Sequence, residues 1–462
     1  MARSEQHDSV VVCVDFGSTF TKAALVDLAD ARIVASASHP TTIETDVLDG
    51  YDACLAELTG QDPRAADAEV LACSSAGGGL RIAVVGNEEL VTAEAGRRVA
   101  LSSGGKVVAV LSRPFEDDAF AELGSTSRPD VVLLTGGTDG GNAEALVAGA
   151  TALRDGGWDG PVVVAGNVDA RDEVAAVLGA IPHVLADNVV PKIGVLAPDS
   201  ARAAIREMFL AHVIGGKHLS ERADFTAMVR GATPDVVLTG VEVLARGLDE
   251  TRPGAGDVVV VDVGGATTDV HSVVEVDPED SGLAREVVAT TPVTRTVEGD
   301  LGMRWSAEST VDAVLDGAAD PALVEAARRR HADPGWLPDS EREVEYDEAI
   351  ARGAVGLALR RHAGRSRVVL SPEGRVVERT GKDLREIDLL VGSGGVLRNG
   401  RAGIAERVLG PGTGEQDGGW QLPRAPRVVI DHDYVLAAVG LLAERHPEAA
   451  YRLSRRLLDD RE

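Results

Sequence analysis

The amino-acid sequence predicts an α/β protein of two lobes, with mixed sheets and an α/β insertion in the first lobe. Two strand–turn–strand segments of the same pattern, 10–28 and 257–275, lie in separate halves of the chain. Strands followed by glycine-rich loops and helical patterns lie between them, which is typical of parallel sheets. The linker Thr251–Gly256 is rich in residues that break helices and strands. We therefore predict a first lobe over 1–256, a second lobe over 257–430, and a returning helix with a tail over 431–462.

The composition is that of a globular protein. The chain has 462 residues, of which 44% are hydrophobic, enough for two or three domains. Its 46 basic and 74 acidic residues give a net charge of −28, which argues against nucleic acid or an anionic membrane as the main partner. No apolar run approaches the roughly 18 residues of a membrane span, and the start, MARSEQHDS, lacks the apolar stretch of a secretory signal. We expect a cytoplasmic protein.

The first strand–turn–strand segment reads VVVCVDFGSTFTKAALVDL. Its valines predict a buried strand that ends at Asp15. A glycine-containing turn between two buried strands can direct several backbone N–H groups at one anion, and Asp15 would suit a Mg²⁺ ion beside a phosphate. The alternative is an ordinary hairpin whose turn is polar. The candidate phosphate-binding residues of the turn and the return strand are Gly17, Ser18, Thr19, Thr21 and Lys22.

The remainder of the first lobe alternates strands and helices. The loop 135–142 (TGGTDGGN) follows a predicted strand, and ligands of parallel sheets bind at the carboxyl ends of strands. This loop is therefore a candidate small-molecule or phosphate site, and the alternative is close packing on a neighbour. Strands are expected at 32–37, 67–72, 81–85, 107–111 and within the units 130–143 and 161–168, and helical segments at 46–58, 87–99, 199–212 and 235–248.

The second strand–turn–strand segment, Asp257–Glu275, repeats the pattern of the first. A buried run of valines ends at Asp262, a Gly/Thr-rich turn follows, and a strand containing Asp269 returns. Two such hairpins form an internal repeat, so that two lobes would bind one polyphosphate–Mg²⁺ group from both sides. The candidate phosphate-binding residues of this turn are Gly264, Gly265, Ala266, Thr267 and Thr268.

A third glycine-rich segment lies at 388–400, where a predicted strand runs into Gly392, Ser393, Gly394 and Gly395. These residues lack bulk, so a flat ring or a sugar can approach the backbone closely. The remaining expected elements are a polar loop opening into a helix at 294–304, a helix at 347–362, a surface loop at 410–422, a strand at 428–430, and a helix at 435–445 with small residues at 438–440.

In this order, the three segments resemble the actin, sugar-kinase and heat-shock-protein ATPase superfamily. The resemblance implies a two-lobed actin-like (ribonuclease H-like) ATPase fold, with 15–22 as the phosphate-1 motif, 262–269 as the phosphate-2 motif and 392–395 as the adenosine motif. The helix at 438–440 resembles the second connecting helix. The resemblance also implies that Asp15 and Asp262 hold Mg²⁺ largely through water and that the turn amides hold the phosphates of ATP or ADP.

Eight segments between about residue 10 and residue 400 carry a closer resemblance: DFGSTFTK, Pro40–Thr42, CSSAGGGL, LTGGTDGGN, VAGN, VDVGGATTDVHS, RTVEGDLGMR and LLVGSGGVLRNG. In these segments the chain resembles the MutL, or GlmL, family of glutamate mutase accessory proteins. One departure is the segment Asn188–Pro191, where the family often has a bulkier, Met-containing segment. Another mutase of the same cobalamin class therefore stays open as the client.

This family resemblance implies an ATP-dependent reactivating chaperone for a coenzyme-B12-dependent mutase, whose subunits would be its partners. Slow Mg²⁺-dependent ATP hydrolysis would rest on Asp15, Asp262 and Lys22, because phosphoryl transfer needs mainly positioning and charge neutralisation. Asp269 would make a further polar contact. The oligomeric state stays open, with a homo-oligomer as one possibility.

Two other functions are compatible with the same features. A small-molecule kinase of the same fold needs a carboxylate base, for which Asp139 and Asp300 are candidates. A redox activator with an iron–sulfur cluster would need cysteine ligands, and the scattered Cys13, Cys54 and Cys73 do not favour one.

Overall fold

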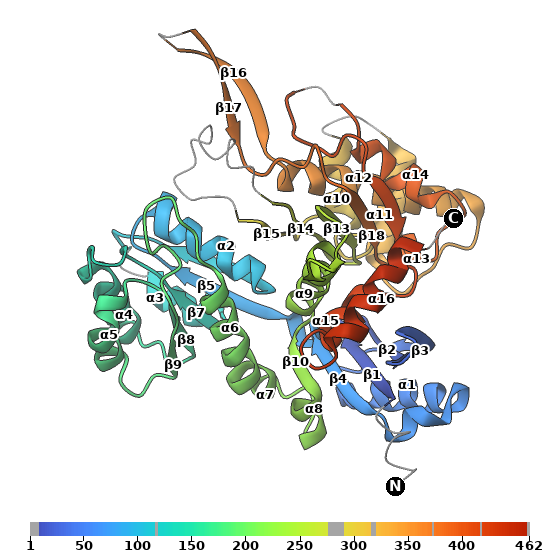
Figure 1. Ribbon diagram of the computed structural model, residues 1–462, viewed down its shortest axis with the longest axis horizontal. Coiled ribbons are helices and arrows are strands. Elements are labelled where there is room, and N and C mark those ends of the chain that lie inside the picture. Colours follow the sequence, from blue (N-terminus) through green and yellow to red (C-terminus); the bar gives the residue numbers. More distant parts are fainter. Residues whose placement is uncertain are drawn as a thin grey trace. The chain divides into compact units, whose positions relative to one another are not determined.

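The computed structural model describes residues 9–115, 119–275, 291–315, 320–371, 374–415 and 418–459 (Figure 1). The chain forms two compact units. The first contains the described residues up to Gly240 together with Ala437–Ala450, and the second contains those from Val241 to Leu436 and from Tyr451 onward. The chain passes between the units within α9 (Thr233–Arg246), α15 (Val435–Leu442) and α16 (Pro447–Asp459), whereas the sequence places the lobe boundary at Gly256.

The central sheet of the first unit has five strands in the order β3-β2-β1-β4-β10. The first three form an antiparallel meander, and β4 and β10 run parallel to β1. The predicted hairpin and third strand are thus present. The strands are β1 (Val10–Phe16), β2 (Phe20–Asp27), β3 (Arg32–Pro40), β4 (Glu69–Ser74) and β10 (Val229–Ala232).

Side chains alternate along β1, so that one face of the sheet carries hydrophobic residues and the other carries Asp15. Val12, Val14 and Phe16 belong to the buried hydrophobic core together with residues of α1 (Val47–Gln61). Asp15 lies on the opposite face, because successive strand residues alternate. Helix α1 begins where predicted, since the side chain of Asp46 accepts a hydrogen bond from Leu48 N at 2.8 Å.

A second sheet, all parallel, is inserted in the first unit between β4 and β10, in the order β6-β5-β7-β8-β9. This confirms the predicted α/β insertion. Strand β9 was not predicted, since its three residues are only partly buried and carry no clear pattern. The strands are β5 (Leu80–Val85), β6 (Gly105–Leu111), β7 (Val131–Leu134), β8 (Val162–Val164) and β9 (His183–Leu185), and the helices are α2 (Glu94–Ser102), α3 (Ala119–Glu122), α4 (Glu144–Asp155), α5 (Arg171–Leu178), α6 (Asp199–Met208), α7 (Ile214–Gly216) and α8 (Ala223–Met228).

The central sheet of the second unit repeats the strand order of the first, as β15-β14-β13-β18-β19. It again has an antiparallel meander followed by two parallel strands. Two sheets of one order, each opened by one of the predicted hairpins, show the actin-like, ribonuclease H-like fold. The strands are β13 (Val258–Val263), β14 (Thr268–Val273), β15 (Val293–Glu298), β18 (Leu389–Ser393) and β19 (Arg427–Ile430).

Helix α12 (Glu341–His362) packs on one face of this sheet, with Ala351, Ala354 and Ala358 in the same core cluster as Val259 and Val261. One correction concerns 294–304, predicted as a loop: its first part is the edge strand β15. The other elements are β11 (Gly247–Asp249), β12 (Arg252–Pro253), α10 (Ala307–Leu315), α11 (Pro321–Ala332), β16 (Arg365–Ser371), β17 (Gly374–Thr380), α13 (Gly395–Arg398) and α14 (Ile404–Val408). No helix in the described ranges is long and apolar enough to cross a bilayer.

Candidate functional site

Asp15 is a buried carboxylate with defined partners. It is the second-last residue of β1, is only 4% exposed, and lies opposite Lys22 in the β1–β2 register. Thr233 Oγ1 donates a hydrogen bond of 2.6 Å to Asp15 Oδ1, and Cys73 Sγ lies 3.6 Å from the same oxygen. The Lys22 ammonium is 3.9 Å from Oδ2. The carboxylate is therefore held in one orientation beside the exposed turn.

The first turn is closed by a hydrogen bond from Gly17 N to Phe20 O at 3.2 Å. A Cβ at Gly17 would lie 2.6 Å from that carbonyl, so a larger residue does not fit. Thr41 donates its hydroxyl to Gly17 O at 2.8 Å and its N–H to Thr19 O at 2.9 Å. Since a trans peptide directs the next N–H away from the carbonyl, the N–H groups of Ser18 and Phe20 point away from Thr41.

Thr21 lies on the other face of the hairpin from Asp15 and Lys22. It is fully buried, and its hydroxyl is 3.2 Å from the hydroxyl of Thr41. Its carbonyl accepts a contact from Cys54 Sγ of α1. Ser18 and Thr19, in contrast, are exposed at the turn. The structure thus groups Asp15, Gly17, Ser18, Thr19 and Lys22 and places the Thr21 hydroxyl with the core.

In the second unit, Asp262 lies directly opposite Asp269 in the β13–β14 register. Arg295, almost fully buried on β15, donates two hydrogen bonds to Asp269 Oδ1, at 3.1 and 2.7 Å. Thr267 Oγ1 donates to the other oxygen of Asp269 at 3.1 Å. The predicted contact residue Asp269 therefore lies beside Asp262 on one face of the sheet, with its carboxylate oriented by a cation and a hydroxyl.

The second turn is closed by a hydrogen bond from Gly264 N to Thr267 O at 2.9 Å. Its carbonyls are bound from one side: Gly264 O by Met303 N at 3.0 Å, Gly265 O by Arg304 N at 2.8 Å, and Ala266 O by Ser306 Oγ at 2.6 Å. By the same trans-peptide geometry, the N–H groups of the three following residues, Gly265, Ala266 and Thr267, point away from this loop. Such a row of amides attracts an anion. Thr268 is fully buried on the opposite face of the sheet from Asp262.

The glycine-rich segment 392–395 lies against the second turn within the same unit. Ser393 is opposite Asp262 in the β13–β18 register. Gly394 has a φ of +106°, and a Cβ there would lie 2.2 Å from Val263 O, so the backbone requires glycine. Gly392 instead fits against the side chains of Leu409 and Ile430, whereas a Cβ at the exposed Gly395 would meet nothing within 4 Å.

Sequence reasoning missed several residues that support these turns. Thr233 begins α9 after a four-residue strand, without a glycine motif to mark it. Thr41 was noted only as part of the segment Pro40–Thr42. Arg295 and Arg304 lie in the motif RTVEGDLGMR, which contributes to the family resemblance but implies no role for either arginine.

The loop 135–142 is packed closely at the carboxyl edge of the inserted sheet. A Cβ at Gly137 would lie 2.2 Å from Asn142 O, and one at Gly166 would lie 2.7 Å from Gly136 O. Asp139 Oδ1 accepts hydrogen bonds from Asn188 at 2.8 Å and from the N–H of Val168 at 3.2 Å. Close packing therefore accounts for Gly137, whereas Gly140, with a φ of +71°, has open space around it.

Both carboxylates considered as a kinase base are engaged by other groups. Asp139 is held as described above. Asp300 accepts hydrogen bonds of 2.6 and 2.8 Å from the Arg361 guanidinium, which holds the pKa of Asp300 below its usual value.

The donor set fits a magnesium ion that is bound mainly through phosphates and water. Within the described residues, no group of three or more His, Cys, Asp or Glu side chains is placed to hold a metal by itself. Mg²⁺ is usually held in proteins by one or two carboxylates together with substrate phosphates and water. Asp15, beside an exposed turn, meets that requirement for its unit.

Residues 11–458 match the model of the family described as MutL protein. Protein MutL of Clostridium tetanomorphum is 37% identical over 459 residues, covering 96% of this chain and 98% of that protein. A nucleotide-free structure of acetone carboxylase aligns over 94% of this chain and 70% of its own at 15% identity, with a TM-score of 0.41. The activator of the 2-hydroxyisocaproyl-CoA dehydratase from Clostridium difficile with bound ADPNP aligns over 98% of each chain at 11% identity, with a TM-score of 0.29. On the family match and the identity over nearly the whole length, the chain belongs to the MutL protein family.

Proposed function

We propose that this protein binds Mg²⁺·ATP, hydrolyses it slowly, and acts as a reactivating accessory protein for a coenzyme-B12-dependent mutase. The observation that carries the nucleotide part is the repeat of one arrangement in two sheets of the same strand order. In each sheet the second-last residue of the first strand is an aspartate, Asp15 or Asp262, and a tight turn follows the strand. The support for an accessory role is the family membership.

In this proposal both turns contact the same nucleotide. The amides of Ser18, Thr19 and 265–267 bind its phosphates, because the N–H groups of Gly17 and Gly264 close the turns. Lys22 neutralises phosphate charge, and the segment 392–395 contacts the adenosine. Asp15 and Asp262 hold the Mg²⁺, which when bound neutralises charge on the phosphates. Hydrolysis of ATP then requires from the protein mainly positioning and charge stabilisation.

We further propose glutamate (methylaspartate) mutase as the client. The resemblance to the MutL, or GlmL, family supports this choice. Nucleotide binding and hydrolysis would drive the two lobes to close and reopen, and this motion would release a damaged cobalamin from the mutase. The functional division proposed for the chain remains 1–256, 257–430 and 431–462.

The nucleotide proposal is tested by calorimetry of Mg²⁺·ATP binding to the wild type and to Asp15→Asn and Asp262→Ala. Hydrogen bonds and contacts of a charged group contribute about 1.5–3 kcal/mol, so each variant should lose about tenfold to a hundredfold in affinity. Unchanged binding by both variants would refute the assigned site. The control is Asp139→Asn, which should bind as the wild type does.

The same Asp139→Asn variant separates an accessory ATPase from a kinase. A kinase that uses this base would lose ATP-dependent phosphorylation of sugars or acids when Asp139 is replaced, and an accessory ATPase would show no such phosphorylation in the wild type.

The client is tested by adding the protein and Mg²⁺·ATP to glutamate mutase inactivated with a damaged cobalamin. Recovery of mutase activity on addition of fresh coenzyme B12, absent with Asp262→Ala, is expected.

A further inference from the structure

Helix α12 carries two adjacent buried carboxylates, Asp347 and Glu348, and each is bound by two arginines from other segments. Neither residue belongs to a motif of the sequence. Asp347 is bound by Arg304 and Arg330, and Glu348 by Arg401 and Arg407.

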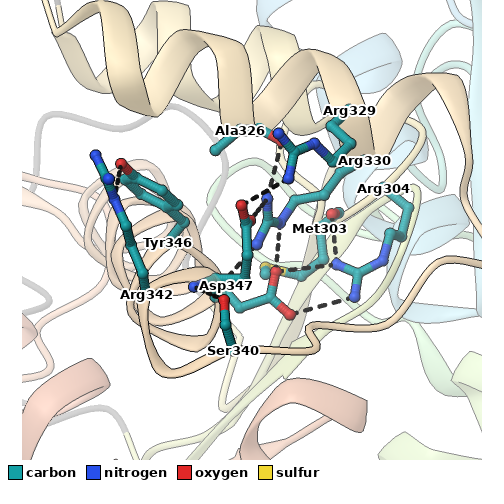
Figure 2. Close-up of polar contacts among 10 residues, drawn as sticks. Met303, Arg304, Ala326, Arg329, Arg330, Ser340, Arg342, Tyr346 and Asp347 are labelled. Atoms are coloured by element: carbon teal, nitrogen blue, oxygen red, sulfur yellow. Dashed lines mark hydrogen bonds and ion pairs between the residues drawn. The ribbon is translucent and has the colours of Figure 1, made fainter.

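Asp347 connects α12 to the loop that supports the second turn (Figure 2). Its two oxygens accept hydrogen bonds of 3.3 and 3.2 Å from the Arg304 guanidinium, and Arg330 Nε donates a third at 2.5 Å. Arg304 is also the residue whose N–H binds Gly265 O at 2.8 Å. The path from the helix to the turn is therefore Asp347, the Arg304 side chain, the Arg304 backbone and the turn carbonyl.

Arg330 fixes the position of the Asp347 carboxylate. Its side chain is fully buried, and three more of its N–H groups are bound, by Ala326 O at 2.9 Å, Glu343 Oε2 at 3.1 Å and Glu343 O at 2.8 Å. The guanidinium also lies 5.2 Å from the ring centre of Trp336. Since these contacts hold the cation in place, they restrict the position of the Asp347 carboxylate.

Glu348 connects the same helix to the segment that follows the glycine-rich loop. Arg401 donates hydrogen bonds of 3.0 and 2.9 Å to its two oxygens, and Arg407 donates two of 2.9 Å. These bonds lower the pKa of the Glu348 carboxyl from 4.5 to about 2. Arg407 lies on α14, which is followed by Leu409, and a Cβ at Gly392 would lie 2.7 Å from the Leu409 side chain.

We propose that Asp347 and Glu348 are positioning residues that hold the two parts of the nucleotide site of the second unit to one helix. Asp347 positions the turn 264–267 for phosphate, and Glu348 positions the segment 392–395 for adenosine. This inference rests on the proposed nucleotide function. Well-packed apolar residues would stabilise the same interior at least as well as buried ion pairs, so the use of charged groups here points to fixed geometry.

The test compares Asp347→Asn and Glu348→Gln, with Glu345→Gln, an exposed carboxylate on the same helix, as the matched control. Binding of Mg²⁺·ATP and of Mg²⁺·tripolyphosphate is measured by calorimetry. Asp347→Asn should weaken both ligands by a similar factor, about tenfold. Glu348→Gln should weaken ATP about tenfold and leave tripolyphosphate unchanged, because only ATP carries an adenosine. A factor of ten corresponds to about 1.4 kcal/mol.

A merely structural role would lower the affinity for both ligands equally in both variants, and that result would overturn the inference. So would wild-type affinities in both variants. If Asp347→Asn or Glu348→Gln fails to fold, Arg304→Lys and Arg401→Lys replace them, because lysine keeps the charge but loses the two-pronged contact. Arg304→Lys should weaken binding of ATP and tripolyphosphate alike, and Arg401→Lys should weaken binding of ATP alone.

Hydrogen exchange gives a second readout that does not depend on nucleotide. Asp347→Asn should speed exchange of amides in 264–268, and Glu348→Gln in 395–400, about tenfold each, with the turn 17–19 unchanged. If the wild type binds neither ligand, the proposed nucleotide function is refuted, and the hydrogen-exchange measurement tests the positioning role by itself. If neither variant shows the faster local exchange, the positioning role of Asp347 and Glu348 is refuted.

Discussion

Asp15 and Asp262 have equivalent places in two sheets but different neighbours. Opposite Asp15 is Lys22, so the first unit offers a carboxylate and an ammonium together. Opposite Asp262 is a second carboxylate, Asp269, whose charge is balanced by the buried Arg295. The two aspartates thus differ in their electrostatic surroundings: Asp15 lies opposite a cation, and Asp262 lies opposite a carboxylate that is already hydrogen-bonded through both oxygens.

Thr233→Val tests the hydroxyl that orients Asp15. The 2.6 Å hydrogen bond to the carboxylate is lost, and the free energy of unfolding should fall by about 1.5–3 kcal/mol, with a several-fold loss of Mg²⁺·ATP affinity. Denaturant unfolding and calorimetry measure the two effects. Thr239→Val, which removes a hydroxyl bonded to Asp235 O on the same helix, should leave the affinity unchanged; equal losses in both variants would contradict the role of Thr233.

His362→Gln tests a buried imidazole whose nitrogens lie 2.8 Å from Ser272 Oγ and 3.0 Å from Thr296 Oγ1. Burial, with the nearby Lys382 and His271, lowers the pKa of His362 from 6.5 to about 3. The unfolded chain therefore binds a proton near pH 6.5 that the folded chain does not bind, and stability falls as the pH drops from 6.5 towards 3. The slope due to this group is at most about 1.4 kcal/mol per pH unit. Urea unfolding at pH 7, 6 and 5 should show a shallower loss in the variant, and an identical slope would contradict it.

At the scale of elements, the second turn depends on the loop that packs beneath it. A Cβ at Gly302 would lie 2.7 Å from Gly265 O and 2.8 Å from Ala266 C. The backbones of the loop and the turn are therefore too close for a side chain at this position. This contact places Met303, Arg304 and Ser306 to bind the turn carbonyls. The turn therefore takes its shape from its own residues and its orientation from the loop.

Gly302→Ala should displace the second turn. Overpacking of this kind costs about 1–3 kcal/mol, and Mg²⁺·ATP affinity should fall with it. Gly299→Ala is the matched control in the same loop, because a Cβ at Gly299 would meet nothing within 4 Å. Calorimetry and thermal unfolding measure the effects, and equal behaviour of the two alanine variants would show that the close approach does not matter.

At the scale of the whole molecule, two units with the same sheet order each carry one turn. The proposal that both turns contact one nucleotide has a direct consequence for stoichiometry. Mg²⁺·ATP should bind with one molecule per chain, and either Asp15→Asn or Asp262→Ala should weaken that single event. Two independent binding events, each removed by one of the two variants, would show that the units act separately.

Nucleotide should also change the relation between the units in solution. We expect a smaller radius of gyration by X-ray scattering with Mg²⁺·ATP than with no nucleotide, and no such change in Asp262→Ala. A scattering curve that is identical in all conditions would contradict lobe closure as the motion in the proposed function.

The two hairpins, the third glycine-rich segment, the insertion and the family can all be predicted from the amino-acid sequence. These features are local: a run of valines, an aspartate and a glycine-containing turn specify a hairpin from neighbouring residues. Asp269 as a further polar contact of the nucleotide stays a prediction of the resemblance. The prediction of a loop at 294–304 is wrong for its first part, because the edge strand VTRTVE has only two hydrophobic residues, Val293 and Val297, and its alternation is therefore weak.

The residues that support the turns become apparent in the folded protein. Thr233 reaches Asp15 across 218 positions of the chain, and Asp347 reaches Arg304 across 43. No local pattern encodes such pairs, since each partner is an ordinary polar residue until the sheets and α12 bring it into contact. The face of each hairpin residue was decided in the same way, because the alternation along paired strands buries Thr21 and Thr268 and leaves Asp15 and Asp262 on the opposite faces.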